Sequence, residues 1–298
     1  MKKIIIAGGS GFLGEILKNH FKKEKYEVYI LTRNPKHKND IYWNGKEIDK
    51  WSNHLENTDA IINLAGKSVD CRYTKKNKKD IYDSRIESTK VLGLAINKCE
   101  NPPKFWINSS TATIYDNSFE RINTEDNGII GDDFSMNIAK SWELAFNEIN
   151  TPKTKKIILR TSIVLGKKGG AIIPLKKIIK LFLGGKQASG KQKVSWIHEE
   201  DFANAIQFLI DNNKQGVFNL CVPKPTDNKT LMKSLRKALN IPFGIPQPKW
   251  LIKAGAFLIG TEPELVTKSR NVFPEKLLNN GFLFKYTNIE NALKDILH

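Results

Sequence analysis

The chain has 298 residues, of which 40% are hydrophobic, so it is long and apolar enough for one large domain with a smaller appendage. Its three cysteines, Cys71, Cys99 and Cys221, show no CxxC spacing, which argues against a disulfide framework and against a metal site. No stretch approaches the ~20 apolar residues of a membrane span, and glycines and Glu15 interrupt the N-terminal apolar run that would otherwise resemble a signal peptide. We therefore expect a cytoplasmic protein with no membrane partner.

The net charge of +17 raises the question of a nucleic-acid partner. The basic residues are 41 lysines and seven arginines, whereas base and phosphate recognition favours the planar fork of arginine. The lysines are also spread along the whole chain with little aromatic interleaving. We expect a solvated basic surface and no nucleic-acid partner, although the positive field would attract an anionic cofactor or substrate.

The N-terminal segment from Ile4 to Gly14 reads IIIAGGSGFLG, an apolar run followed by a glycine-rich turn, and an amphipathic stretch runs from Phe12 to Phe21. The order of strand, turn and helix is the context in which such glycines bind a dinucleotide. Gly8 allows the tight turn off the strand, Gly11 lets the backbone approach a pyrophosphate, and the N-terminus of the helix holds the anion. The predicted cofactor-binding residues of this turn are Gly8, Ser10, Gly11, Phe12, Leu13 and Gly14.

The second strand, Val28 to Leu31, ends in Thr32 and Arg33. Folds of this kind usually place Asp or Glu here, against the ribose 2′-hydroxyl of NAD. An arginine suits a 2′-phosphate and a threonine hydroxyl can bond it, so these two residues favour NADP(H) over NAD(H). The competing interpretation is that Arg33 is a solvated surface charge.

Short apolar strands alternate with helical stretches through the first two-thirds of the chain, which predicts an α/β fold with a doubly wound parallel sheet of the Rossmann type. After the first βαβ unit we expect strands at 60–64, 105–109, 157–161 and 216–220 and helices at 75–98 and 134–150. Beyond Cys221, prolines punctuate short helical stretches. We expect residues 1–222 to form a NAD(P)-binding domain and 223–298 a smaller, mainly helical cap, to which residues 166–191 could also contribute.

Small and polar residues follow several of these strands, at the carboxyl edge where ligands bind in such sheets. The segment 63–66 suits backbone that passes beneath a cofactor, and the segment 109–115 clusters hydroxyl groups at the end of the next strand. A tryptophan and a histidine share a short strand at 194–198, where a structural role for the histidine is the alternative. We predict Asn63, Leu64, Ala65, Gly66 and Ser109 as cofactor-binding residues and Arg85, Trp196 and His198 as substrate-binding residues.

Across essentially its whole length the chain resembles the extended short-chain dehydrogenase/reductase superfamily. Within that superfamily it is similar to the atypical "epimerase family protein" branch, which is NAD-dependent epimerase/dehydratase-like and has a characteristic C-terminal domain. The segments that carry the resemblance are GGSGFLG, NLAG, DSRIESTKVL, SSTATIY, LRTSIVLGKKGGA, ASGKQ, SWIHEED, GVFNLCVPKP, FPEKLLNNGF and NALKDIL.

The resemblance implies a catalytic centre of Ser/Thr, Tyr and Lys, in which the tyrosine exchanges a proton with the substrate hydroxyl while the nicotinamide exchanges a hydride. Thr111 falls at the Ser/Thr position and Lys140 at the Lys position, but Met136 stands where the YxxxK tyrosine belongs. A methionine cannot transfer a proton. Tyr115 is the predicted substitute donor, with structural packing as the alternative. The YxxxK sequence at Tyr42 lies between the second and third strands, too early in the chain to be the catalytic motif.

The leading expectation is an NADP(H)-dependent epimerase or reductase that acts by hydride transfer on a small or sugar-nucleotide-like substrate. The alternative is a non-catalytic NADP(H)-binding regulatory or scaffold protein, because the usual proton donor is missing. Relatives of this type often pair through two helices per subunit, and the helices expected at 75–98 and 134–150 are the matching candidates for a homodimer.

Overall fold

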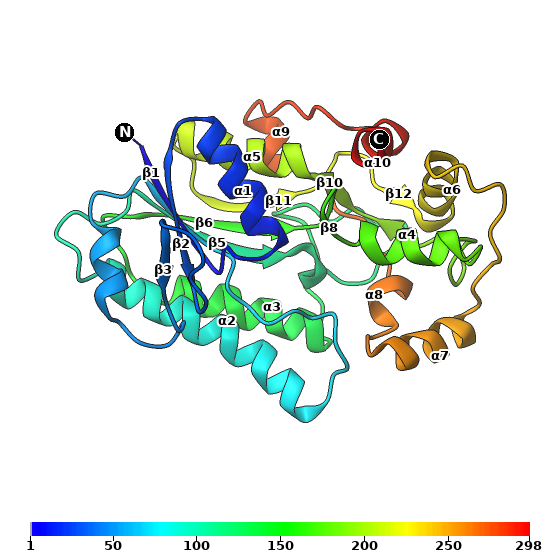
Figure 1. The fold of residues 1–298 in the computed structure, drawn as a ribbon, viewed down its shortest axis with the longest axis horizontal. Coiled ribbons are helices and arrows are strands. Elements are labelled where there is room, and N and C mark those ends of the chain that lie inside the picture. Colours follow the sequence, from blue (N-terminus) through cyan, green and yellow to red (C-terminus); the bar gives the residue numbers. More distant parts are fainter. Residues whose placement is uncertain (1) are drawn as a thin grey trace.

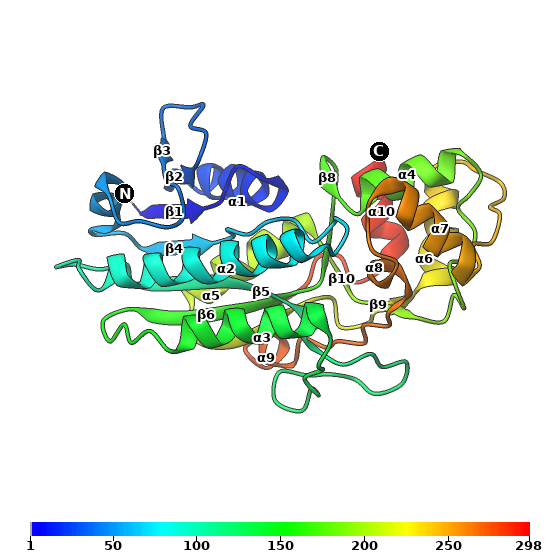
Figure 2. The same ribbon diagram turned by 90° about the horizontal axis from the view of Figure 1, so that it is seen from below.

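The computed structural model describes residues 2–298, with the backbone alone described at positions 258 and 259. Seven parallel strands form the central sheet in the order β11-β6-β5-β4-β1-β2-β3. Helices cover both faces of this sheet, and a mainly helical cap lies beyond one end of its strands (Figures 1 and 2). The expected α/β fold with a doubly wound parallel sheet and a helical cap is confirmed.

The sheet consists of β1 (Lys3–Ala7), β2 (Glu27–Thr32), β3 (Asp40–Tyr42), β4 (Ala60–Asn63), β5 (Phe105–Thr111), β6 (Lys155–Thr161) and β11 (Gly216–Leu220). The helices around it are α1 (Phe12–Lys23), η1 (Lys50–Leu55), α2 (Lys75–Ile96), η2 (Ala112–Ile114), α3 (Phe134–Asn147), α5 (Glu199–Asp211) and α9 (Glu275–Asn279). The cap contains α4 (Ile172–Lys180), α6 (Asn228–Ala238), α7 (Lys249–Ile259), α8 (Glu264–Thr267) and α10 (Ile289–Leu297). Two small sheets complete the fold, one of β7 (Ile163–Gly166), β8 (Gly169–Gly170) and β10 (Trp196–His198), the other of β9 (Lys193–Val194) and β12 (Thr226–Asp227).

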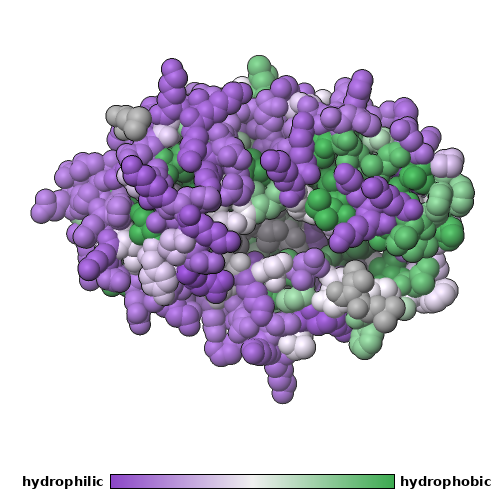
Figure 3. All heavy atoms as spheres, viewed as in Figure 1, coloured by the Kyte–Doolittle hydropathy of each residue, from purple (hydrophilic) through white to green (hydrophobic). Residues whose placement is uncertain are grey.

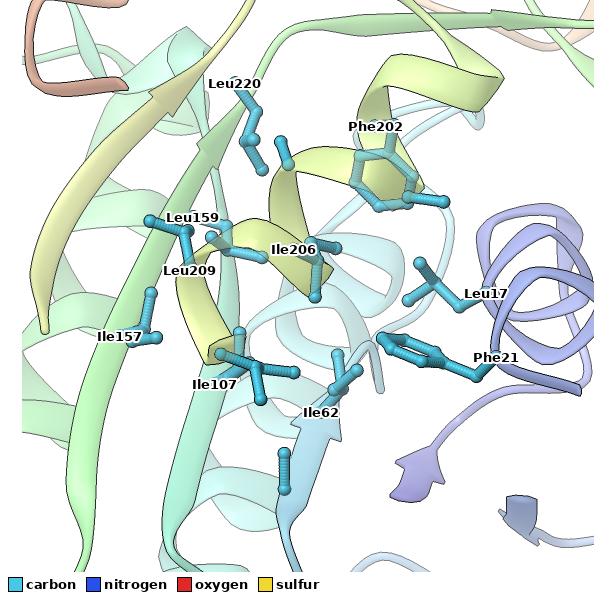
Figure 4. Close-up of a cluster of buried hydrophobic side chains, with 14 of the residues drawn as sticks. Leu17, Phe21, Ile62, Ile107, Ile157, Leu159, Phe202, Ile206, Leu209 and Leu220 are labelled. Carbon is cyan, nitrogen blue, oxygen red and sulfur yellow. The ribbon is translucent and has the colours of Figure 1, made fainter. Parts of the chain in front are cut away.

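The apolar run of β1 supplies both faces of the sheet because side chains alternate along a strand. Ile4 and Ile6 join the hydrophobic cluster beneath α1 and α5, whereas Ile5 and Ala7 join the cluster beneath α2 and α3. Figure 4 shows the first cluster, in which Phe21 of α1 and aliphatic side chains of α5 point toward the strands. A fully buried side chain of this size contributes roughly 1.5–3 kcal/mol, so β1 is held from both sides.

The cap has a hydrophobic cluster of its own, which joins α4 and Trp196 of β10 to α6 and α10. Residues 166–191 thus pack with the C-terminal helices. The packing does not divide cleanly at residues 222 and 223, however, because Leu277 and Phe282 of the C-terminal segment belong to the cluster beneath α1 and α5. The chain therefore returns to the Rossmann domain before it ends in the cap.

Two elements at one edge of the sheet, β3 and η1, have no counterpart in the sequence prediction. Tyr42 ends β3 with its side chain 60% exposed and pairs in register with Thr32 of β2, whereas Thr111 lies four strands away at the end of β5. The long helices end slightly earlier than expected, α2 at Ile96 and α3 at Asn147. In the described part of the chain, the helices are all too short or too polar to cross a membrane.

Candidate functional site

The glycine-rich turn between β1 and α1 is built on two positions that exclude a side chain. Gly8 has a φ of 72°, in the left-handed region, and a Cβ there would lie 2.7 Å from Cα of Ala65. A Cβ at Gly14 would meet the carbonyl of Gly9, so the first turn of α1 lies directly against the turn. These contacts explain why the first and third positions of the pattern require glycine.

The N-terminus of α1 is open where an anion would bind. Gly11 is its N-cap residue and, among the described residues, provides no side-chain cap, so the N–H groups of the first turn remain available for a ligand. A Cβ added at Gly11 would meet no described atom within 4 Å. The packing of the protein itself therefore does not require a glycine at position 11. This is expected if the glycine serves to let a ligand approach the backbone.

Gly8→Ala and Gly11→Ala are expected to separate folding from cofactor binding. Gly8→Ala should lower the free energy of unfolding by at least about 1 to 3 kcal/mol, because it forces a side chain into left-handed backbone and against Ala65. Gly11→Ala should leave the urea midpoint within the error of the wild type yet weaken NADPH binding at least about tenfold. Urea denaturation and fluorescence titration measure the two effects, and equal loss of stability in both variants would contradict this reading of the turn.

The short β7–β8 hairpin lies against Phe12, the first residue of α1. The Phe12 side chain is 2.8 Å from where a Cβ at Gly170 would lie and 2.9 Å from one at Gly166, and it would also collide with a Cβ at Gly169. Glu199 holds the hairpin from below by accepting the backbone N–H of Lys167 at 3.2 Å. Sequence reasoning missed this element, although the GKKGG run after a strand was its signal.

A cavity of about 360 Å³ opens between the turn and the end of β2. Its lining includes Ser10 of the turn, Thr32 at the strand end, and Asn34, Lys36 and His37 of the following loop. Arg33 is exposed and is not part of this lining. The sequence predicted Thr32 and Arg33 at the 2′-phosphate position. In the structure the cavity wall includes Thr32 but continues with Lys36 and His37 of the loop instead of Arg33.

Two carboxylates also line this cavity, but each has a partner. Asp40 accepts the backbone N–H groups of Lys36 and His37 at 2.8 and 3.0 Å, which folds the loop. Glu15 pairs with Lys18 at 3.1 Å. Lys36 and His37 thus lie on a loop in which the Asp40 carboxylate already accepts two backbone N–H groups.

The loop after β4 is held by a buried amide network. The Asn63 side chain donates to Asn108 at 2.8 Å and to Thr89 at 3.1 Å, and its oxygen accepts the N–H of Ala65 at 3.1 Å. Because Asn63 is fully buried, it positions Leu64, Ala65 and Gly66 rather than touching a ligand itself. The backbone of Leu64 and Ala65 is what faces Gly8 of the glycine-rich turn.

Arg85 supports the same loop from α2. Its Nη1 donates to the carbonyls of Lys67 and Ile81, both at 3.0 Å, and its guanidinium lies 5.0 Å from the Trp142 ring centre. Burial lowers the pKa of Arg85 to about 10, which still leaves it charged at neutral pH. A Cβ at Gly66 would lie 3.1 Å from the guanidinium carbon, so the predicted substrate-binding arginine lies directly behind the predicted cofactor loop.

The expected catalytic positions gather where β5 ends and α3 begins. Thr111 is the last residue of β5, half-buried, and its hydroxyl accepts the N–H of Thr113 at 3.1 Å, while Ser109 precedes it on the same strand. Met136 is buried in the first turn of α3, with its sulfur packed over Gly131. One turn later, Lys140 is partly exposed and pairs with Asp132 at 2.7 Å.

Tyr115 is not placed as a proton donor. Its side chain is fully buried, its hydroxyl accepts from Arg160 at 2.9 Å and donates to Asn219 at 2.8 Å, and burial raises its pKa. Arg160 in turn forms a two-bond ion pair with Glu143 of α3 at 2.8 and 2.9 Å. The prediction of a substitute donor at Tyr115 is therefore corrected, since the hydroxyl ties β6 to β11 inside the protein.

Trp196 and His198 are likewise not placed to bind a substrate. Trp196 is 1% exposed and belongs to the core of the cap. His198 is 1% exposed, stacks on Tyr286 and accepts the N–H of Glu200 as the N-cap of α5. Burial lowers the pKa of His198 even though Asp295 lies 3.4 Å from Nε2, so the structural interpretation of this segment holds.

A polar cluster that sequence reasoning missed joins the start of α3 to the cap. Lys268 pairs with Asp133 and Glu264, and Glu264 accepts the hydroxyl of Ser135. Tyr73 packs edge-on against Phe134, the first residue of α3, and burial raises its pKa to about 12. No local sequence pattern could predict this cluster, because its members come from three segments that are far apart in the chain.

The chain matches the model of the NAD dependent epimerase/dehydratase family over residues 4–221 and a domain of unknown function, DUF1731, over residues 247–296. It is 33% identical to the epimerase family protein YfhF of Bacillus subtilis over 99% of this chain and 97% of that protein. The structure of the human epimerase family protein SDR39U1 with NADPH superposes with a TM-score of 0.90, at 29% identity and 99% coverage of both chains. UDP-N-acetylglucosamine 4-epimerase from Bacillus cereus shares the fold, with a TM-score of 0.78 at 18% identity, 100% coverage of this chain and 98% of that one. Together with the glycine-rich turn and the sheet, these matches show that the chain belongs to the NAD-dependent epimerase/dehydratase family.

Proposed function

We propose that this chain binds NADP(H) in preference to NAD(H) and acts as an epimerase or reductase on a small or sugar-nucleotide-like carbinol or carbonyl substrate. The observation that carries the cofactor preference is the cavity after β2. It has Ser10, Thr32, Lys36 and His37 on its wall. A wall with hydroxyl and basic groups suits a phosphate, and NADPH is the cofactor named with the human relative.

The turn and the loops around it fit the rest of such a cofactor. The N-terminus of α1 would hold the pyrophosphate beside Gly11, and the backbone of Leu64, Ala65 and Gly66 would lie along the nicotinamide half. When bound, the cofactor would supply or accept a hydride. The protein would orient it by the glycine-rich turn on one side and by the β7–β8 hairpin over Phe12 on the other.

For catalysis, we assign Thr111 to orient the substrate oxygen and Lys140 to exchange the proton. Both lie at the carboxyl edge of the sheet, at the end of β5 and on α3. The contact of Lys140 with Asp132 is on the surface, so little energy is needed to release the ammonium group for a substrate. Arg85 remains a candidate substrate contact through the donors that its bonds to Lys67 and Ile81 do not use.

A non-catalytic role as an NADP(H)-binding regulatory protein is the second candidate. The observation that favours it is the combination of Met136 at the tyrosine position and Tyr115 locked in a buried network. Neither can move a proton between protein and substrate. In this case the cofactor site remains, and the adjacent hydroxyls serve only the fold.

The cofactor preference is tested by calorimetric titration with NADPH and NADH. Wild type should bind NADPH more tightly, and Lys36→Ala should narrow the preference by roughly ten- to a hundredfold, whereas Arg33→Ala should change it much less because Arg33 is exposed and does not line the cavity. That range corresponds to the loss of one charge-assisted contact, ~1.5 to 3 kcal/mol. Lys38→Ala is the matched control, because Lys38 is exposed on the same loop but does not line the cavity. Equal affinity of the wild type for both cofactors would rule out the assignment.

A further inference from the structure

Large hydrophobic side chains lie exposed over the cap. Leu181, Phe243, Ile245 and Trp250 are 67%, 57%, 50% and 69% exposed, and Phe182 is 40% exposed. Figure 3 shows the contrast across one face of the molecule, with hydrophobic residues gathered over the cap and hydrophilic residues over the Rossmann domain. We call these five residues the apolar cap surface.

The apolar cap surface is continuous because its two segments pair with each other. Phe182 and Phe243 stack with ring centres 4.8 Å apart, and the N–H of Ile245 donates to the carbonyl of Phe182 at 2.7 Å. Four residues after Ile245 the chain enters α7 at Lys249, and the second residue of this helix is Trp250. Backbone hydrogen bonds thus join the two segments into one platform from which several large side chains project.

The chain segments that form this platform carry charge of one sign. Residues 162–198 and 228–261, which include α4, α6 and α7, contain no Asp or Glu. Among the basic residues of these segments, Lys180, Lys186, Lys249 and Lys253 are exposed beside or within the apolar cap surface. The combination of exposed tryptophan and phenylalanine with unopposed lysines is typical of proteins that lie on anionic membrane surfaces.

We propose that the apolar cap surface docks on an anionic lipid bilayer, with Trp250 and Phe243 entering the interface and the neighbouring lysines contacting lipid phosphates. This goes beyond the proposed reaction and does not depend on it. A membrane-spanning segment is not involved, in keeping with the described helices. A second copy of the chain is a poorer occupant, because two such faces would bring lysines against lysines. The expectation of no membrane partner considered only segments long enough to span.

Trp250 offers a direct readout of docking. The other five tryptophans, Trp43, Trp51, Trp106, Trp142 and Trp196, are at most 5% exposed, so a shift of tryptophan emission caused by vesicles would come from Trp250. The full chain should float with vesicles of phosphatidylcholine mixed with phosphatidylglycerol and show a blue shift. It should bind vesicles of phosphatidylcholine alone at least about tenfold more weakly. High salt should reduce binding, and Trp250→Phe should keep binding while abolishing the shift.

Variants locate the surface. Phe243→Ser with Trp250→Ser should lower vesicle binding at least about tenfold, and Lys180→Ala or Lys253→Ala about fivefold each. Matched controls are Leu283→Ser, at a position 88% exposed outside the cap surface, and Lys90→Ala on α2. Thermal unfolding checks that every variant is folded.

Three outcomes would overturn the proposal. The first is failure to bind anionic vesicles at low salt, and the second is equal binding by the cap-surface and control variants. The third is a dimer, or a complex with a single-stranded oligonucleotide, that Trp250→Ser disrupts while vesicles are not bound. NADPH titration of the same variants stays unchanged in all cases if the proposed cofactor function holds, so the two proposals fail separately.

Discussion

Replacing Glu143 by alanine is expected to lower the free energy of unfolding by about 3 to 5 kcal/mol. Arg160 of β6 is buried, and its two hydrogen bonds to Glu143 of α3 are 2.8 and 2.9 Å long. Burial alone would disfavour the charge, but Glu143 outweighs it and raises the pKa of Arg160. Without the carboxylate the guanidinium remains charged, buried and unpaired, and Ser110 also loses its acceptor. Urea denaturation at neutral pH measures the loss.

Two further variants provide stability losses with which the Glu143→Ala loss can be compared. Tyr115→Phe should cost about 1 to 3 kcal/mol, because it removes one hydroxyl from the network and leaves a partner unsatisfied. Lys104→Ala breaks the ion pair with Asp59, in which the lysine is 73% exposed, and should cost no more than about 1 kcal/mol. A Glu143→Ala loss as small as that of Lys104→Ala would show that the network is not the structural tie that its geometry implies.

The parts of the fold that could be predicted from sequence are those with local causes. The βαβ unit at the N-terminus follows from an apolar run, glycines at fixed spacing and an amphipathic stretch, and each of these acts within about twenty residues. The parallel order of the strands follows from their alternation with helices. The edge strand β3 is only three residues long and half exposed, so it has no hydrophobic pattern by which it could be recognised.

The site was less predictable because burial and partners are set by distant segments. Tyr115 follows a hydroxyl-rich strand as a donor should, but Arg160 and Asn219, 45 and 104 residues away, capture its hydroxyl. The sequence around His198 resembles that of a site residue. In the structure, however, His198 is the N-cap of α5 and stacks on Tyr286. Conversely, Lys36 and His37 face the cavity only because Asp40 folds their loop.

The largest expected effect on chemistry is at Lys140. If the protein is an enzyme, Lys140→Met should lower turnover ~10²- to 10⁴-fold while changing NADPH affinity much less, since general acid–base catalysis contributes about that much. Thr111→Val should lower turnover by a smaller factor through poorer orientation of the substrate oxygen. Tyr115→Phe should affect stability and leave turnover of the folded fraction nearly unchanged. The measurement is NADPH oxidation with a panel of carbonyl compounds and sugar nucleotides.

Two other results would change the assignment in distinct ways. If wild type oxidises NADPH with no member of the panel, while NADPH still raises its melting temperature through mass action, the regulatory alternative gains support. If turnover survives the combined loss of Thr111, Tyr115 and Lys140, both the assigned and the earlier predicted donors are excluded. Tyr73 then becomes the next candidate, because it packs against Phe134 at the start of α3, two residues before Met136. Tyr73→Phe would then abolish the remaining turnover if the Tyr73 hydroxyl is the donor, and would leave turnover unchanged if Tyr73 only packs against Phe134.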